Sequence, residues 1–134
     1  PADIFIPVWR DGMKTAFDIT VVSPMQSAFI DRAATTPGAA IEARKLSKLR
    51  AHEDNCRAQH INFVPLVVET FGGWDAGAVK HLKEMASCAA RRLGNDPAII
   101  KRQLFQRLSI LLQRGNATLL INKDAVAPPH ITGD

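Results

Sequence analysis

The chain has 134 residues and a formal net charge of +4, with 17 Lys and Arg against 13 Asp and Glu. This length suits one domain with its own core, and no apolar run is long enough to span a bilayer. The basic balance favours a polyanionic partner. The two cysteines, Cys56 and Cys88, form no Cys-x-x-Cys motif, which favours a reducing, intracellular setting over a disulfide scaffold.

Two strands joined by a turn open the chain. Residues 2–8 and 15–23 are rich in β-branched and aromatic residues and predict strands, and residues 9–14 predict a turn built on an Asp-Gly pair. Each strand carries one acid, Asp3 or Asp18. A carboxylate inside a sheet is costly unless it is paired or binds a metal. If the strands pair antiparallel, these two acids lie close together.

A helix and a third strand follow. Residues 39–52 are strong helix formers, and residues 60–70 hold the most apolar short run of the chain, Leu66 to Val68. Such a run is typical of a central, buried strand. Pro65 within it indicates a bulge or an edge, because proline has no backbone N–H to donate.

Two further helices complete the chain. One is predicted over residues 74–93 and ends at Gly94, and the other begins at an Asp96-Pro97 cap, with a break or kink expected near residues 115–116. We predict an ordered domain over residues 1–123 and a mobile tail over 124–134. Since the sequence begins without Met, almost inside a strand, we expect an excised or C-terminal part of a larger protein.

The order β-β-α-β-α-α predicts an α/β fold, a small mixed β-sheet flanked by helices. The first two strands form an antiparallel hairpin. The helix between strands two and three makes a right-handed crossover, so those two strands run parallel.

A third acid, Glu69, ends the third strand. Three carboxylates on one sheet edge, Asp3, Asp18 and Glu69, predict a site for Mg²⁺ or Mn²⁺ that activates water and stabilises charge on a phosphoryl oxygen. Lys45 and Lys48, three residues apart on one helix face, are candidates for the ammonium group that orients or deprotonates that water.

A purely structural interpretation of the same acids stays open. Asp3 would cap a frayed first strand, Asp18 would pair with a surface Lys or Arg, and Glu69 would cap the glycine turn that follows it. Ion pairs also place acids at strand ends, so the pattern alone does not choose.

Basic residues gather in two segments, around residues 44–50 and 91–114. We predict that five of them contact nucleic-acid phosphates: Lys48, Arg91, Arg92, Lys101 and Arg102. Such contacts give affinity and salt sensitivity without reading sequence. The alternative is two solvated helix faces. Trp9 and Trp74 are predicted to flank the acids, where each stacks on a base or packs in the core.

Four segments together carry a resemblance to a known family: PADI at 1–4, FDITV at 17–21, EARK at 42–45 and VPLVVETFGGW at 64–74. Across most of residues 1–121 the chain resembles the restriction-enzyme-like endonuclease domain of reverse transcriptases from site-specific non-LTR retrotransposons, and related transposon-derived proteins. That family belongs to the PD-(D/E)XK nuclease superfamily. The resemblance implies a restriction-endonuclease-like fold and Mg²⁺-dependent nicking of DNA.

Carried over by position, the resemblance makes Asp3 the acid of the PD half-motif and Asp18 the acid of the (D/E)XK half. Glu69 becomes an accessory acid. The superfamily lysine falls at Thr20, and in these retroelement domains it is typically displaced onto the next helix. Lys45 fits that role, with Lys48 as second choice.

We therefore expect a DNA endonuclease that is fused to, or works with, a reverse transcriptase in an intracellular, nuclear location, with homodimerisation left open. One alternative is a catalytically inactive nuclease-like fold that binds nucleic acid or another protein. A third hypothesis is a plain α/β scaffold whose basic helices form an oligomer interface.

Overall fold

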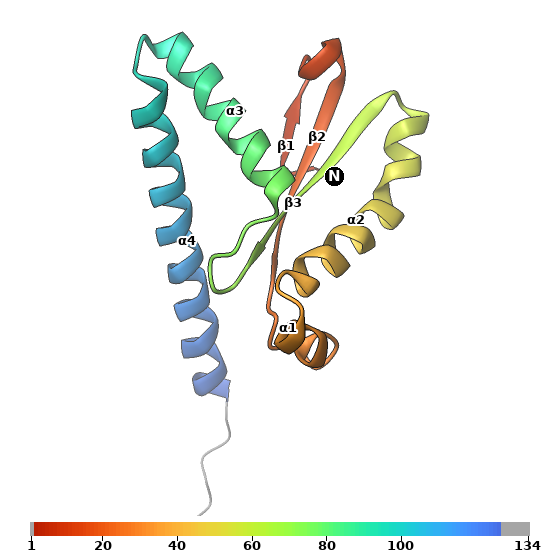
Figure 1. Ribbon diagram of the computed structural model, residues 1–134, viewed down its shortest axis with the longest axis vertical. Helices are drawn as coiled ribbons and strands as arrows, with labels where there is room; N and C mark the ends of the chain where they lie inside the picture. The colour runs from red at the N-terminus through yellow and green to blue at the C-terminus, as the bar shows by residue number, and fades with distance from the viewer. Residues whose placement is uncertain (1, 127–134) are drawn as a thin grey trace, which may run out of the picture.

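A computed structural model of the chain describes residues 2–126, with side chains described over 2–123 (Figure 1). Its elements in chain order are β1 (Ile4–Ile6), η1 (Arg10–Gly12), β2 (Lys14–Val22), α1 (Ile30–Thr35), α2 (Ala39–Ala58), β3 (Ile61–Glu69), α3 (Ala76–Leu93) and α4 (Pro97–Val126). The predicted order of strands and long helices is confirmed, with η1 and α1 as short additions.

The three strands form one sheet in the order β1-β2-β3. β1 runs antiparallel to β2, with Ile4 opposite Phe17, and β2 runs parallel to β3, with Asp18 opposite Pro65. Both the predicted hairpin and the predicted parallel crossover through α2 are confirmed. The structure is thus a mixed α/β fold with a small mixed sheet.

Helices cover both faces of this sheet (Figure 1). Because successive side chains of a strand point to opposite faces, neighbouring residues of β3 enter different layers. Leu66 joins Phe17 and Leu82 in a cluster on the α3 side. Val67 joins a second cluster with Ile41 on the α2 side.

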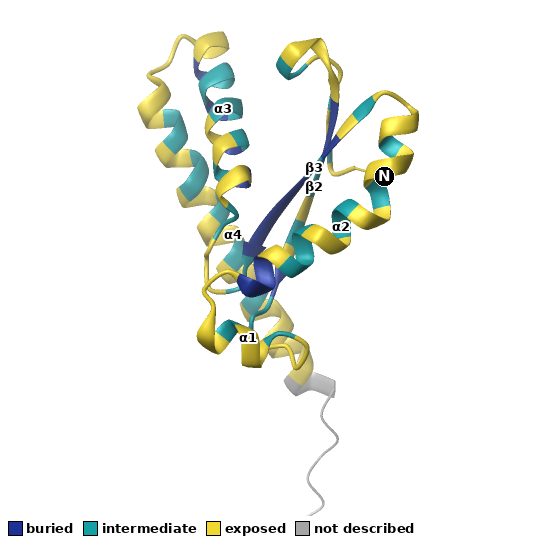
Figure 2. Ribbon diagram, turned by 45° about the vertical axis from the view of Figure 1, so that its right-hand side comes forward, coloured by how far each residue is buried: buried dark blue, intermediate teal, exposed yellow. Residues whose placement is uncertain are grey.

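β3 lies at an edge of the sheet, so the prediction of a central strand is wrong while the edge that Pro65 indicated is right. Leu66 and Val67 are nevertheless 0% exposed, because helices cover both faces of the strand (Figure 2). Past Pro65, the loop that follows β3 bonds to the outer edge of β3, where a further strand would otherwise pair. Asp75 N donates to Val67 O at 3.0 Å.

Three helix predictions differ from the structure, and one of them is the start of α3, which lies at Ala76 rather than at residue 74. α2 continues to Ala58 rather than residue 52. An ion pair between Glu53 and Arg57 at 2.9 Å supports its polar last turns. α4 has no break near residue 115. There the Asn116 amide donates to Thr70 O at 2.8 Å.

The predicted caps are present. Gly94 ends α3 in the left-handed conformation with φ 66°. Asp96 Oδ1 accepts from Ala98 N at 2.8 Å, which caps the start of α4. Of the predicted mobile tail, residues 124–126 belong to α4 and residues 127–134 lie outside the described residues. Within the described part, no helix combines the length and apolar character needed to cross a membrane.

Candidate functional site

Asp18 is the acid around which the candidate site is built. It stands in the middle of β2 on the face that α2 covers, and its side chain is 14% exposed. Its Oδ2 accepts from Thr20 Oγ1 at 3.0 Å and lies 2.9 Å from Lys48 Nζ. The costly carboxylate inside the sheet is therefore paired, as one of the two sequence interpretations required.

The sheet-facing side of α2 changes from apolar to cationic along the helix. Ile41 packs in the core near the start of α2, and Lys45 and Lys48 follow it at helical spacings of four and seven residues. Between Ile41 and Lys45, the Arg44 Nε atom is buried without a hydrogen-bond partner among the described residues. Packing of Ile41 thus fixes the rotation of α2 that turns Lys48 towards Asp18.

Lys45 meets a different acid, one that sequence analysis missed. Its Nζ donates to Asp75 Oδ1 at 3.1 Å, and Asp75 Oδ2 accepts from Ala78 N at 3.0 Å as the N-cap of α3. The sequence carries a signal for this role, because Asp is a preferred N-cap residue. The predicted helix begins at Trp74, two residues too early for Asp75 to be its cap.

Asp3 lies directly beside Asp18, as the hairpin predicted. Its backbone N donates to Phe17 O at 3.0 Å, and its carboxylate Oδ2 accepts from Ile19 N at 2.7 Å. These two bonds bracket Asp18 on the neighbouring strand. They also show Asp3 capping the start of β1, as the structural interpretation proposed.

Glu69 lies apart from the other two acids. It is opposite Val22, four positions along β3 from Pro65, the neighbour of Asp18. Four positions correspond to about 13 Å along a strand, whereas metal ligands bind within about 2.0–2.6 Å. Glu69 N donates to Gly73 O at 2.7 Å, so this residue supports the glycine turn.

The predicted group of three carboxylates is therefore not assembled. Within residues 2–123, no three His, Cys, Asp or Glu side chains come together as metal ligands. Asp3 and Asp18 form a smaller set, and Oδ1 of each accepts no hydrogen bond from the described residues. Mg²⁺ is commonly bound by one or two carboxylates, with waters and substrate phosphates completing the shell. The pair fits that donor set.

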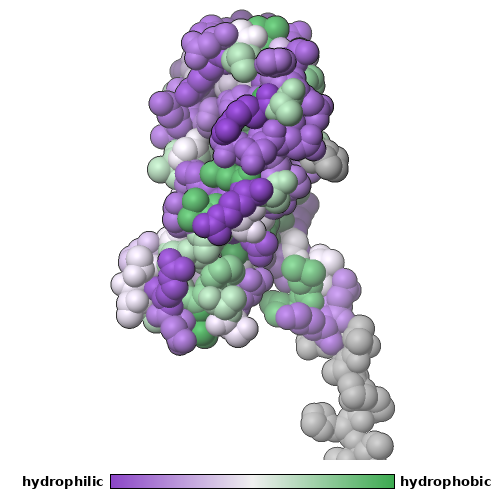
Figure 3. Space-filling model, turned by 90° about the vertical axis from the view of Figure 1, so that its right-hand side faces the viewer, coloured by the Kyte–Doolittle hydropathy of each residue, from purple (hydrophilic) through white to green (hydrophobic). Residues whose placement is uncertain are grey.

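The predicted phosphate-binding residues occupy both layers. Lys48 forms an ion pair with Asp18, and its side chain is 27% exposed. The other four lie on α3 and α4, in the layer opposite α2: Arg91, Arg92, Lys101 and Arg102. Only Lys101 among those four is half-buried, and the others are exposed. Figure 3 views the α2 side, where hydrophilic side chains cover much of the surface.

Both tryptophans pack in the α3 layer and do not flank the acids. Trp9 packs edge-on against Phe17 with ring centroids 5.7 Å apart. Trp74 packs edge-on against Phe105 at 6.5 Å. The core interpretation of these two residues is correct, and neither presents a free face beside Asp18.

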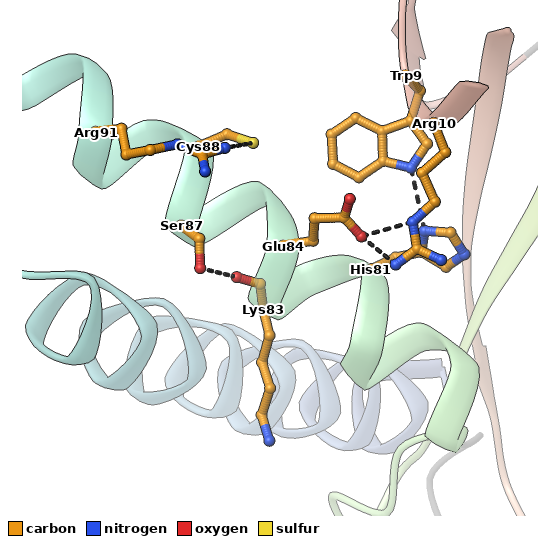
Figure 4. A network of polar contacts seen from close by, with 8 residues as sticks. All are labelled: Trp9, Arg10, His81, Lys83, Glu84, Ser87, Cys88 and Arg91. Atoms are coloured by element: carbon orange, nitrogen blue, oxygen red, sulfur yellow. Dashed lines mark hydrogen bonds and ion pairs between the residues drawn. The ribbon is translucent and has the colours of Figure 1, made fainter. Parts of the chain in front are cut away.

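A polar network ties the turn after β1 to α3 (Figure 4). Trp9 Nε1 donates to His81 Nδ1 at 3.3 Å, and Arg10 forms an ion pair with Glu84. The hydrogen bond from Arg10 lowers the pKa of the Glu84 carboxyl below its ordinary value. Burial, with a smaller contribution from Arg10, lowers the pKa of His81. The network fastens the hairpin against α3.

Comparison with known proteins gives no relative. No family model matches the chain, no curated protein matches it, and no solved structure matches it.

Proposed function

We propose that this domain is a metal-dependent DNA endonuclease with a restriction-endonuclease-like fold of the PD-(D/E)XK type, using Mg²⁺ or Mn²⁺. The observation that carries the proposal is the contact of Lys48 Nζ with Asp18 Oδ2 at 2.9 Å, with Asp3 bonded on both sides of Asp18. Two acids on adjacent strands and one lysine are the residue types that this chemistry uses.

The position of the lysine supports the proposal. Thr20 stands where the superfamily places its lysine, two residues after Asp18 on the same face of β2. The Thr20 hydroxyl bonds Asp18 Oδ2, and Lys48 brings an ammonium group to the same oxygen from α2. A lysine supplied by the helix therefore compensates for the one absent from the strand.

Each residue then has a distinct role. Asp3 and Asp18 hold the metal ion through their carboxylates. When bound, Mg²⁺ supplies Lewis acidity and lowers the pKa of a water molecule. Lys48 would orient the attacking water and stabilise the developing negative charge with its ammonium group, which already lies 2.9 Å from Asp18 Oδ2. Lys45, which the sequence favoured for this role, instead joins α2 to Asp75.

The substrate follows from charge and resemblance. The exposed arginines of α3 and α4 form a cationic surface for DNA phosphates. This surface lies in the layer on the other side of the sheet from the acids. Association with a reverse transcriptase and a nuclear location belong to the same proposal, through the family resemblance alone.

One observation favours a second candidate, a catalytically inactive fold that binds nucleic acid. One oxygen of each acid already accepts a hydrogen bond from the protein, and within residues 2–123 no three-ligand group exists. Such a protein would keep the lysine–aspartate pair as a structural contact and bind DNA without cutting it.

Nicking of supercoiled plasmid with Mg²⁺ or Mn²⁺ separates the two candidates. We expect cleavage by the wild type, none with EDTA, and a loss of roughly a hundredfold or more for Lys48→Met, as for removal of a group that stabilises developing charge. Asp18→Asn should abolish cleavage. Lys45→Met, one turn away on the same helix, is the matched control and should keep most activity.

Three results would contradict this assignment. Salt-sensitive DNA binding without cleavage in either metal supports the inactive fold instead. Greater loss for Lys45→Met than for Lys48→Met returns the catalytic role to Lys45. Equal cleavage by wild type and Asp18→Asn excludes the site altogether. Melting temperatures of all variants show whether each is folded.

A further inference from the structure

A hollow of about 370 Å³ lies between the sheet and the second half of α2. Its floor includes Phe5, Ala16 and Phe63 from the three strands. Its wall on α2 includes His52 and Cys56. Ala16 stands between the two phenylalanines, opposite Phe5 in β1 and Phe63 in β3. Its small side chain leaves the space that the two larger residues border.

This row of residues is next to the acids on the same face. Asp18 follows Ala16 by two positions in β2, and Asp3 precedes Phe5 by two positions, directly before the start of β1. Residues two apart in a strand share a face and lie about 7 Å apart. An aromatic row and an acidic row therefore lie side by side across the sheet, about one nucleotide step apart.

The floor of the hollow offers aromatic faces. Phe5 is 51% exposed although it lies on a face that a helix partly covers. Phe63 is buried and packs against the His52 ring, with centroids 5.3 Å apart. Bases stack on aromatic side chains of this kind, at sites that tolerate any sequence.

The rim of the hollow offers an amide pair. Gln59 Nε2 donates to Asn55 Oδ1 at 3.0 Å. That bond leaves the Asn55 Nδ2 donor and the Gln59 Oε1 acceptor without a partner among the described residues. A donor and an acceptor side by side match the edge of a nucleobase.

We propose that this hollow holds an unstacked nucleobase of a single DNA strand, whose neighbouring phosphate lies at Asp3 and Asp18. This inference rests on the proposed nuclease function, because it takes the acids as the point where the strand is cut. It assigns to Phe5 the stacking face, and to the Asn55–Gln59 pair the hydrogen bonds to the base edge.

Fluorescence of a short oligothymidylate with one 2-aminopurine tests the proposal in Ca²⁺, a hard cation that also takes oxygen ligands and can join the phosphate to Asp3 and Asp18. Gel analysis of the same samples shows that the strand is uncut. We expect Phe5→Ala to bind about tenfold more weakly than wild type, as for the loss of one stacked base. Phe5→Trp should restore binding. Phe71→Ala, which removes a phenylalanine that is 72% exposed elsewhere on the surface, is the matched control and should bind as wild type.

The two cysteines give an independent measurement on the unmodified chain. Cys56 lines the hollow, whereas Cys88 lines a groove against α3 on the other layer. We expect the oligonucleotide to slow alkylation of Cys56 by N-ethylmaleimide several-fold and to leave Cys88 unchanged.

The outcomes separate this inference from the nuclease proposal. Stacking that depends on Phe5, without nicking by the wild type, keeps the base site and removes the nuclease. Nicking with equal oligonucleotide binding by wild type and Phe5→Ala keeps the nuclease and overturns the base site. No binding, equal loss in Phe71→Ala, or equal protection of both cysteines also overturns it.

Discussion

The two faces of the sheet are covered by different kinds of side chain. On the α3 side, apolar residues such as Phe17 and Leu66 pack against α3 and α4, and both are 0% exposed. On the α2 side, Ala16 and Phe63 are buried at one end and an apolar cluster around Ile41 and Val67 fills the other. Between those ends, lysines of α2 meet aspartates of the sheet and of α3.

This difference separates the part that stabilises the fold from the part suited to chemistry. Apolar burial contributes roughly 25 cal/mol per Å² removed from water. The pair of Lys48 and Asp18 is largely buried, with side chains 27% and 14% exposed, so the cost of removing the two charges from water offsets most of their attraction. We expect a functional site at this seam of charged residues, because the seam contributes little to stability and lies beside the hollow.

The largest effect should come from the apolar face. Leu66→Ala removes a side chain that is 0% exposed and leaves a cavity against α3, so we expect a loss of about 3 kcal/mol in the free energy of unfolding. Val67→Ala, its neighbour facing α2, removes fewer buried atoms and should cost less. Urea denaturation measures both, and a larger loss for Val67→Ala would break the comparison.

A smaller effect should follow from Asp75, which joins the two layers. Asp75→Ala removes the cap of α3 and the partner of Lys45, and we expect a loss of about 1–2 kcal/mol in the free energy of unfolding. Asp96→Ala removes an exposed cap of α4 that has no lysine partner among the described residues, and is the matched control. Equal losses in the two variants would show that the contact with Lys45 adds nothing to the free energy of unfolding.

The third prediction concerns pH and the α3 face. The pKa of His81 is lowered by burial and by Arg10, so the unfolded chain takes up its proton more readily than the native protein. The stability contributed by neutral His81 is present above about pH 6.5 and is lost as pH falls through the folded pKa.

Melting temperatures measured from about pH 7.5 down to pH 5 test this prediction. The wild type should lose stability over that range, and His81→Gln should lose less of it. The lowered pKa of Glu84 acts in the same direction but in a more acidic range. An unchanged pH dependence in His81→Gln would contradict the assignment to His81.

The smallest net change is expected for a double substitution in the charged seam. Asp18→Leu combined with Lys48→Met replaces the ion pair with apolar residues, and stability should stay within about 1 kcal/mol of wild type. Asp18→Leu alone leaves Lys48 without its partner and should be less stable than the double variant. A double variant that loses the sum of both single losses would show no coupling across the seam.

Local features of the fold were predictable from the sequence. The strands, the caps at Gly94 and Asp96, and the pairing of the first two strands follow from short-range patterns. The edge position of β3 was signalled by Pro65, but the apolar run beside it favoured a central strand. A strand covered by helices on both faces is apolar wherever it stands in the sheet, so composition alone could not choose.

The candidate site was predictable only in part. Asp3 and Asp18 are 15 residues apart and are brought together by one hairpin, so the pattern of acids in strands sufficed. Choosing between Lys45 and Lys48 required the rotation of α2 and the position of Asp75, which lies 30 residues after Lys45. Glu69 was misplaced because the parallel register sets it four positions from the neighbour of Asp18.

The sequence by itself determined the elements, their order and the two acids of the hairpin, because helix caps, turns and strand alternation act over a few residues. Tertiary structure alone decided which lysine meets Asp18, which acid stays at a turn, and that a hollow lies beside the acids. Those features depend on how α2 packs across the sheet. That packing is set by contacts between residues such as Ile41 and Val67, which are distant in the chain.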